Sequence, residues 1–212
     1  MDIPEEIKEQ VKKELSGISK KVTLKVFTDD KNCDYCKDTL ELTRAVAELS
    51  DLLSVVEYKK SASQAEIAQY NVEMTPAILV HSEEKDWPIR FYGIPSGYEF
   101  SSLIESIHFA GTGVVDLPPD VVTKLKAIQK PISIKSFVTV SCPYCPAAVT
   151  TAFKFAMINP EFITAQMVEA SQFPEVSNKF QVRAVPKVVI NETINFEGSL
   201  PVAQYLEKVL QA

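Results

Sequence analysis

The sequence predicts an α/β protein built from two copies of one folding unit in tandem. The string C-x-Y-C occurs twice, at 33–36 and 142–145, and uses all four cysteines of the 212-residue chain. Each copy follows a strand-like apolar run and enters a helical pattern. A proline stands 43 residues after the first cysteine in one half and 44 in the other, directly before an apolar run. Three landmarks in the same order indicate a duplication.

The first half is predicted to run helix, strand, helix, strand, helix, strand, strand, helix. Ile3, Ile7 and Val11 recur at helical spacing, and Gly17 is the expected end of that helix. A strand is expected at 22–27, a helix after Cys36, a strand at 52–58 and a strand after Pro76. A last strand at 88–93 precedes a closing helix with Phe100, Leu103, Ile104 and Ile107 on one face.

The second half repeats this order. Asp120 is the expected N-cap of its first helix, which Pro131 ends. Strands are expected at 132–138, 162–168, after Pro186 and at 193–198. Helical spacing recurs in Val149, Phe153 and Met157 and, at the end of the chain, in Val202, Leu206 and Val209. We place the boundary near 117–119, which gives two domains, 1–116 and 117–212.

Composition narrows the function classes. Hydrophobic residues make up 46% and charged residues 24%, as in ordinary globular proteins, and the net charge of −6 disfavours a nucleic-acid partner. We expect no membrane-spanning helix, because no run of about 18 apolar residues occurs. The charged, helix-patterned start is unlike a secretory signal, so a cytoplasmic setting is expected. Four cysteines in a reducing compartment indicate catalysis or metal binding more than structural bridges.

The cysteine spacing favours redox chemistry over zinc. Structural zinc sites separate their two C-x-x-C knuckles by about 15–20 residues, whereas 105 residues lie between Cys36 and Cys142. A cysteine between a strand and a helix lies at the helix N-terminus, where free N–H groups and the helix dipole stabilise a thiolate. We therefore predict that Cys33 and Cys142 attack a disulfide and that Cys36 and Cys145 resolve it, with no bound metal and no cofactor.

The two prolines predict a binding edge. Proline lacks the N–H that a strand ladder needs, so its place before an apolar strand is explained by a cis peptide bond that offers a kinked backbone to a ligand. We predict that Thr75–Pro76 and Val185–Pro186 are cis and face their own cysteine pairs.

These residues resemble the thioredoxin superfamily, in which a strand, a C-x-x-C helix and a pre-strand proline recur in this order. CPYC, residues 142–145, is the glutaredoxin motif. Two such units in one chain are similar to the protein disulfide oxidoreductases of hyperthermophilic archaea and bacteria. The resemblance implies two tandem thioredoxin-like domains, each a central mixed sheet flanked by helices. It also implies activity on protein disulfides and a thermophilic source, which the charged fraction alone does not indicate.

The chain departs from its relatives at several positions. Val26 and Ser136 stand where thioredoxin has a buried acid; Glu57 and Glu169 are alternative acids that we expect at the surface. The chain also lacks the Gly-Gly and acidic residue with which glutaredoxins hold glutathione, so a protein disulfide is the better substrate. The halves differ after the first cysteine. Asp34 should oppose thiolate formation at Cys33, whereas Pro143 suits the first helical position. We predict that the second pair is the stronger oxidant.

Three functions stay open at this stage. The leading one is an enzyme that reduces, forms or isomerises disulfides in protein substrates. A second is an electron carrier between a thioredoxin-reductase-like flavoenzyme and a peroxiredoxin. The third is a non-catalytic binding module or a zinc-bridged structural protein.

Overall fold

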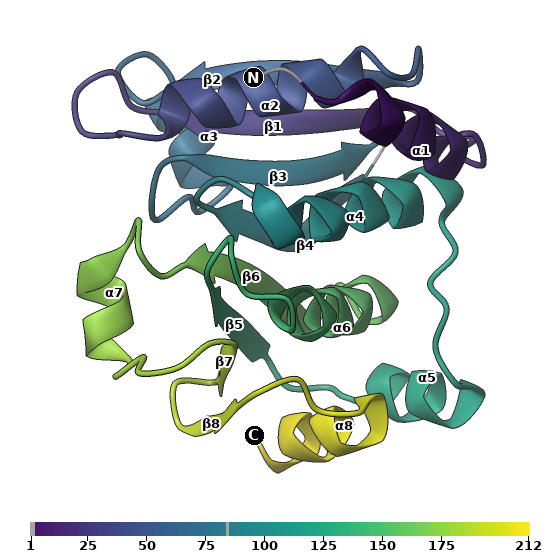
Figure 1. The fold of residues 1–212 in the computed structure, drawn as a ribbon. Coiled ribbons are helices and arrows are strands. Elements are labelled where there is room, and N and C mark those ends of the chain that lie inside the picture. The colour runs from purple at the N-terminus through teal and green to yellow at the C-terminus, as the bar shows by residue number, and fades with distance from the viewer. Residues whose placement is uncertain (1–2, 84) are drawn as a thin grey trace.

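The structure, a computed structural model, describes residues 3–83 and 85–212 and shows the predicted order of elements twice (Figure 1). The first half contains α1 (Glu5–Leu15), β1 (Val22–Thr28), α2 (Cys36–Ala47), β2 (Leu53–Lys59), α3 (Gln64–Gln69), β3 (Ala77–Ser82), β4 (Lys85–Tyr92), the 3-10 turn η1 (Gly97–Glu99) and α4 (Phe100–Thr112). The second half contains α5 (Pro119–Lys126), β5 (Ile132–Val138), α6 (Cys145–Ile158), β6 (Ile163–Glu169), α7 (Pro174–Lys179), β7 (Lys187–Ile190), β8 (Ile194–Glu197) and α8 (Val202–Gln211).

One eight-stranded sheet runs through both halves in the order β2-β1-β3-β4-β6-β5-β7-β8. Within each half the first two strands are parallel and the last two are antiparallel, so the predicted mixed sheet is confirmed. The halves join where β4 pairs in parallel with β6, with Ile89 opposite Ala165 and Tyr92 opposite Val168. The fourth strand of one unit therefore lies beside the second strand of the next, a head-to-tail arrangement.

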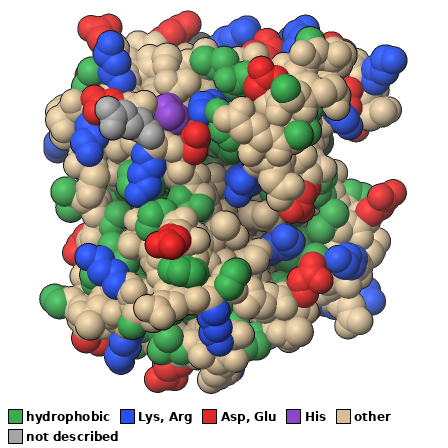
Figure 2. All heavy atoms as spheres, turned by 180° about the vertical axis from the view of Figure 1, so that it is seen from behind, with side chains coloured by type: hydrophobic (Ala, Val, Ile, Leu, Met, Phe, Trp, Pro, Cys, Tyr) green, Lys and Arg blue, Asp and Glu red, His purple; other side chains and the backbone are tan. Residues whose placement is uncertain are grey.

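The two faces of the sheet are covered by different helices. The longer helices pack on one face over an apolar core that is continuous from the first half to the second. The short helices α3 and α7 pack on the other face, where Ile67 and Val176 meet a smaller cluster around Phe27 and Phe137. Between them that face is partly polar: Figure 2 shows Lys, Arg, Asp and Glu side chains among apolar ones, with a histidine near the edge.

Helix α6 lies at the junction of the halves. It contacts β4 and α4 of the first half as well as the strands of its own half, and the rings of Phe91 and Phe153 meet edge to face at 5.0 Å. Most of the surface of α6 is buried, and its sequence, CPAAVTTAFKFAMI, is accordingly apolar around most of the helix. Its counterpart α2 carries Lys37, Glu41 and Arg44 on a solvent-facing side.

The residues between α4 and α5 form the connection of the two halves. The boundary that we predicted between residues 116 and 117 falls in this segment and stays a prediction. Within the part of the chain that the structure describes, no helix combines the length and the apolar character needed to cross a membrane.

Candidate active sites

The two cysteine pairs are disulfides at the starts of equivalent helices. Cys33 is bonded to Cys36 and Cys142 to Cys145, with Cα atoms 5.4 and 5.5 Å apart. The second cysteine of each pair is the first residue of α2 or α6, and the first cysteine lies in the preceding turn. Cys33 is partly exposed and Cys36 is buried. Each pair therefore meets the N-terminus of its helix, as the spacing predicted.

Asp34 and Pro143 lie two residues before the first helical position at which we expected them. The prediction that Pro143 occupies the first helical position is wrong, because α6 begins at Cys145. The turn before it is closed by the N–H of Cys145, which donates to the carbonyl of Cys142 at 3.4 Å. Asp34 occupies the equivalent turn before α2. The influence of these two residues on the thiols stays a prediction.

Both predicted prolines follow cis peptide bonds, Thr75–Pro76 and Val185–Pro186. Each proline carbonyl accepts a hydrogen bond from the glycine after the last strand of its half, at 3.0 Å from Gly93 and 2.8 Å from Gly198. The carbonyl oxygen of Val185 lies 3.8 Å from Sγ of Cys142. In the first half, Thr75 and Pro76 line a groove together with Cys33. Each proline loop thus faces its own cysteine pair, and its substrate-binding role stays a prediction.

We call that groove the Cys33 groove. It has a volume of about 550 Å³, and both halves line it. The first half contributes Asn32, Cys33, Asp34, Tyr35, Thr75 and Pro76, and the second half contributes Ser171, Gln172, Phe173 and Pro174. No motif or spacing pointed to the second set, because it lies in an ordinary polar turn before α7.

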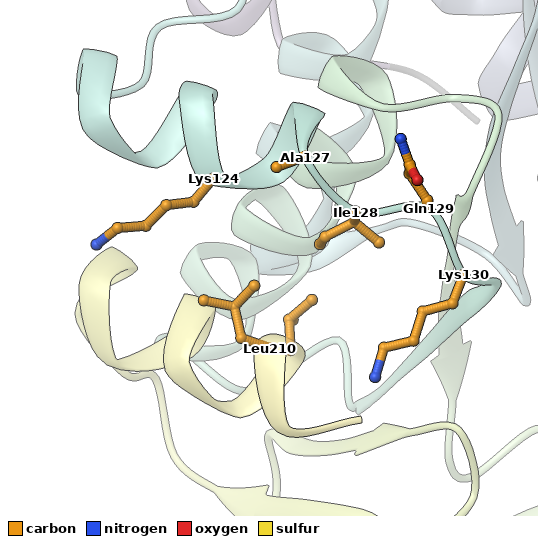
Figure 3. A pocket seen from close by; sticks show the side chains of 7 residues that line it. Lys124, Ala127, Ile128, Gln129, Lys130 and Leu210 are labelled. Carbon is orange, nitrogen blue, oxygen red and sulfur yellow. The ribbon is translucent and has the colours of Figure 1, made fainter.

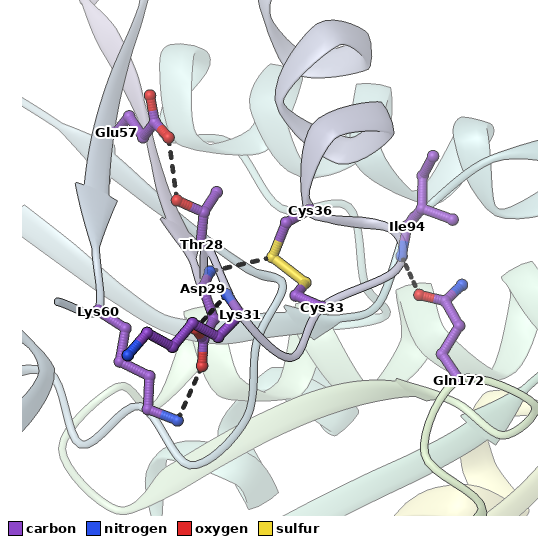
Figure 4. The surroundings of a disulfide bond; sticks show 9 residues. All are labelled: Thr28, Asp29, Lys31, Cys33, Cys36, Glu57, Lys60, Ile94 and Gln172. Carbon is purple, nitrogen blue, oxygen red and sulfur yellow. Dashed lines mark hydrogen bonds and ion pairs between the residues drawn. A yellow bond between two sulfur atoms is a disulfide. The ribbon is translucent and has the colours of Figure 1, made fainter.

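A polar hollow of about 360 Å³ lies on the other side of the same disulfide (Figure 4). Glu57 and Thr28 line it together with both cysteines, and the Thr28 hydroxyl donates to Glu57 at 2.9 Å. The backbone N–H of Asp29 donates to Sγ of Cys36 at 3.2 Å. Hydrogen bonding to the backbone of Lys31 and to Lys60 lowers the pKa of the Asp29 carboxyl. The carboxylates of Glu57 and Asp29 therefore line the same hollow as Cys36, the predicted resolving cysteine.

The second pair has apolar surroundings at the matching positions. Glu57 is opposite Val26, and Met167 is opposite Ser136 in the same register, so Met167 is the counterpart of Glu57. Met167 is fully buried, as is Val138, the counterpart of Thr28. The sequence pattern suggests that Glu57 and Glu169 are equivalent surface acids. That expectation is wrong for Glu169, which is 2% exposed and accepts a hydrogen bond from the N–H of Gln172 at 2.8 Å.

The first half also contacts the loop before Cys142. The N–H of Tyr98 in η1 donates to the carbonyl of Val140 at 3.0 Å. The next residue, Glu99, is fully buried, and burial raises the pKa of its carboxyl to about 7 although the Ser102 hydroxyl donates to it. Tyr144 beside the pair is 70% exposed. The second site therefore combines buried sulfurs with an exposed aromatic rim.

One further hollow, of about 390 Å³, lies between α5 and α8, away from both cysteine pairs. Figure 3 shows Ile128 and Leu210 in it and Lys124 and Lys130 at its edges. None of its lining residues belongs to a cysteine or proline loop. Across residues 3–83 and 85–212, no three His, Cys, Asp or Glu side chains gather in a group that could hold a metal ion.

Comparison with known proteins identifies the family. The Thioredoxin_3 family, described as a thioredoxin domain, matches residues 22–105 and again 132–211. The chain belongs to this thioredoxin-domain family. The two matches cover the two repeats, so the tandem thioredoxin-like architecture is confirmed.

Two solved structures resemble the whole thioredoxin-domain pair. The NTD_N/C domain of alkylhydroperoxide reductase AhpF from Enterococcus faecalis superposes with a TM-score of 0.91 at 26% identity, covering 98% of this chain and all of that one. A protein disulfide oxidoreductase from Aeropyrum pernix gives 0.89 at 28% identity, covering 99% and 93%.

Curated relatives are longer proteins. An alkyl hydroperoxide reductase component of Pseudomonas aeruginosa is 25% identical over 203 residues, which are 96% of this chain and 36% of the relative. The chain spans about a third of the length of the curated relatives it matches. Two domains that each hold a C-x-x-C pair at a helix start contain the groups that dithiol–disulfide exchange requires.

Proposed function

We propose that the chain exchanges disulfides with polypeptide substrates at two separate sites. Cys33 and Cys142 are the attacking cysteines, and Cys36 and Cys145 resolve. The observation that carries the proposal is the repeated juxtaposition of a helix-start cysteine pair and a cis-proline loop. In the first pair the assigned attacker is the more exposed residue, and in the second the exposed fractions are 7% for Cys142 and 0% for Cys145.

The exchange balances without a cofactor. In the reducing direction the Cys33 thiolate attacks one sulfur of a substrate disulfide, which breaks, and the other substrate sulfur leaves and takes up a proton. Cys36 then loses its proton and attacks Sγ of Cys33, which releases the second substrate thiol and forms the Cys33–Cys36 disulfide. Two electrons and two protons pass from the dithiol to the substrate. The second pair follows the same steps, and each reverses when the chain acts as an oxidant.

Polypeptide disulfides suit these sites better than glutathione. The Cys33 groove is long enough to be lined by both domains, and Tyr35 and Tyr144 offer exposed aromatic rims. The segment after β4, where glutaredoxins hold glutathione, instead receives Gln172 from the other half. The similarity to a protein disulfide oxidoreductase over nearly the whole chain supports the same substrate class.

A role as an electron carrier is the second candidate, and the similarity to alkyl hydroperoxide reductase components favours it. The part of the longer Pseudomonas alkyl hydroperoxide reductase component that aligns corresponds to nearly the whole of this chain. We propose that the chain passes electrons from a flavin-dependent disulfide reductase to a peroxiredoxin, with one dithiol facing each partner. Reconstitution with a thioredoxin-reductase-type flavoenzyme and a peroxiredoxin tests this: hydroperoxide-dependent oxidation of NADPH should need the chain and stop when all four cysteines are serine.

Reduction of insulin by dithiothreitol tests the main proposal. We compare the natural chain with Cys33→Ser/Cys36→Ser, with Cys142→Ser/Cys145→Ser and with the quadruple variant. Each double variant should keep part of the rate, and the quadruple variant should fall to the uncatalysed rate. Natural activity in the quadruple variant, with folding confirmed by circular dichroism, rejects the assignment of the cysteines.

A further inference from the structure

The Cys33 groove has a wall that comes from the other domain. Residues 171–174, from the turn after β6 and the first residue of α7, line it together with Thr75 and Pro76. The side-chain oxygen of Gln172 accepts a hydrogen bond from the N–H of Ile94 at 3.1 Å, which ties this segment to the end of β4 (Figure 4). We call residues 171–174 the groove wall.

The groove wall is held before any substrate arrives. Its Gln172 N–H donates to the buried Glu169 carboxylate, and the Phe173 N–H donates to the Glu169 carbonyl at 3.2 Å. Phe173 packs against the apolar cluster of the second face, and α7 begins at Pro174. Ser171 is exposed and lines the groove. The wall therefore needs little ordering when a chain binds beside it.

The described sheet provides no equivalent of this wall for the second site, where Tyr98, Ser101 and Glu105 of the first half instead share a separate hollow with Pro143 and Pro146. The equivalent of the groove wall is 61–64, which follows β2, and β2 is an edge strand with no further unit beside it. Similarly, β8 is the other edge, so nothing in the described sheet stands beside β8 as β6 stands beside β4. The wall is therefore a property of the first site that arises from the head-to-tail joining of the domains.

We propose that the groove wall is a substrate-binding element of the first site. An extended polypeptide that carries the reacting disulfide lies in the Cys33 groove, with its backbone beside Thr75 and Pro76 and its other side against the wall. The amide NH₂ of Gln172 has no hydrogen-bond partner among the described residues and is the donor available to a substrate carbonyl. This inference rests on the proposed function and defines its substrate as polypeptide on both sides of the reacting sulfur.

The inference separates polypeptide substrates from small disulfides. A small aromatic disulfide needs only Cys33, whereas a polypeptide also fills the space between Pro76 and Ser171. The first site should then select among polypeptides by the residues that flank their cysteines, and the second site, which has no equivalent of residues 171–174, should depend less on those residues.

The experiment uses the full chain with Cys142→Ser/Cys145→Ser, so that only the first site reacts. We measure kcat/KM for a disulfide-linked peptide and for dithiodipyridine and take their ratio. Ser171→Trp should lower the ratio at least tenfold and Gln172→Ala about threefold. Ser61→Trp, which places the same side chain at the duplicated and exposed position of the first half, is the matched control and should keep the natural ratio.

A trapped complex gives an independent readout. In the variant Cys36→Ser/Cys142→Ser/Cys145→Ser, Cys33 attacks a disulfide-linked peptide and keeps one half as a mixed disulfide, while the other half leaves as a thiol. Exchange of the backbone amide hydrogens at 171–173 should then slow at least threefold relative to the peptide-free chain. An unchanged ratio in Ser171→Trp, or unchanged exchange in the complex, overturns the inference while leaving the proposed function intact. A first site that reduces neither substrate defeats the proposed function itself.

Discussion

The two halves of the molecule share one folding unit and place their cysteine pairs in opposite surroundings. The first pair lies between a groove that both halves line and a polar hollow with Glu57. The second pair is backed by Met167 and Val138, and the first half contacts the loop before it. The motif C-x-Y-C is the same in both, so the difference comes from what each unit meets across the junction.

The head-to-tail joining explains this difference. Because β4 of the first unit pairs with β6 of the second, only the first unit has a neighbour on its β4 side and only the second has one on its β2 side. A two-fold arrangement would have given both sites the same surroundings. Four predictions test whether the surroundings, rather than the motif, set the behaviour of each half.

The largest effect is expected at the two equivalent glycines that follow β4 and β8. Both have positive φ, 94° at Gly93 and 82° at Gly198, so alanine is strained at either by about 2 kcal/mol. A Cβ on Gly93 would also lie 2.7 Å from Cβ of Glu169, whereas a Cβ on Gly198 meets nothing within 4 Å. Gly93→Ala should therefore lower the free energy of unfolding by about 4 kcal/mol and Gly198→Ala by about 2, as measured by urea unfolding. Equal losses would show that the junction tolerates the extra atom.

The next effect concerns the buried acid at the junction. The pKa of Glu99 is raised from 4.5 to about 7 because burial disfavours its charged form. Between these pH values the unfolded chain releases a proton that the folded chain keeps, so this group's contribution is full below about pH 4.5 and declines until about pH 7. The decline amounts to about 3 kcal/mol.

Glu99→Gln should remove this decline, which urea unfolding at pH 5 and pH 8 measures. Its control is Glu105→Gln, an exposed position on α4, the helix that begins directly after Glu99. A decline of natural size in the Glu99 variant contradicts the raised pKa.

A smaller effect is expected where Glu57 and Met167 occupy equivalent positions. Glu57 lines the same hollow as the resolving Cys36, and we predict that it accepts the proton of Cys36, so Glu57→Gln should slow the first site about tenfold at pH 7. Met167→Leu is the matched control and should leave the second site's rate within twofold. Stopped-flow reduction of chains with a single cysteine pair measures both rates, and an unchanged rate in Glu57→Gln rules out this proton acceptor.

The smallest effect is the redox difference that the sequence suggested. Asp34→Pro removes a charge that opposes the Cys33 thiolate, so it should raise the reduction potential of the first pair by about 20 mV, equivalent to about 1 kcal/mol. Pro143→Asp should lower the potential of the second pair by a similar amount. Titration of single-pair chains in dithiothreitol and glutathione buffers measures each value, and shifts of the opposite sign reject the idea.

Local sequence patterns were enough to predict the folding unit that the chain repeats. Element order, the cysteine pairs and both cis bonds follow from spacing within short stretches, and the repeat made each half a check on the other. The helix start was off by two residues at Pro143, because the cysteine turn closes before α6 begins. The mostly apolar sequence of α6 was a usable sign of a helix buried on more than one side, and it points to the junction.

Long-range relations were not accessible from one sequence. The pairing of Ile89 with Ala165 depends on packing between distant segments, so neither the continuous sheet nor the groove wall could be foreseen. Glu57 was matched to Glu169 because both close a strand, and only the register shows that Met167 is the true counterpart. Gln172 gave no signal, because a glutamine in a polar turn is ordinary until its contact with Ile94 is known.

The head-to-tail sheet has a further consequence at its two ends. A sheet that is built by adding units side by side leaves an unpaired strand at each end, and in the described sheet these edge strands are β2 and β8. Unpaired edges invite further strands and aggregation, and proteins discourage this with short strands and charged side chains. The edge strand β8 has only four residues, and β2 carries Glu57 and Lys59. Glu57 thus also helps to protect the edge strand on which it lies, so one position both distinguishes the two redox sites and discourages pairing at this edge of the sheet.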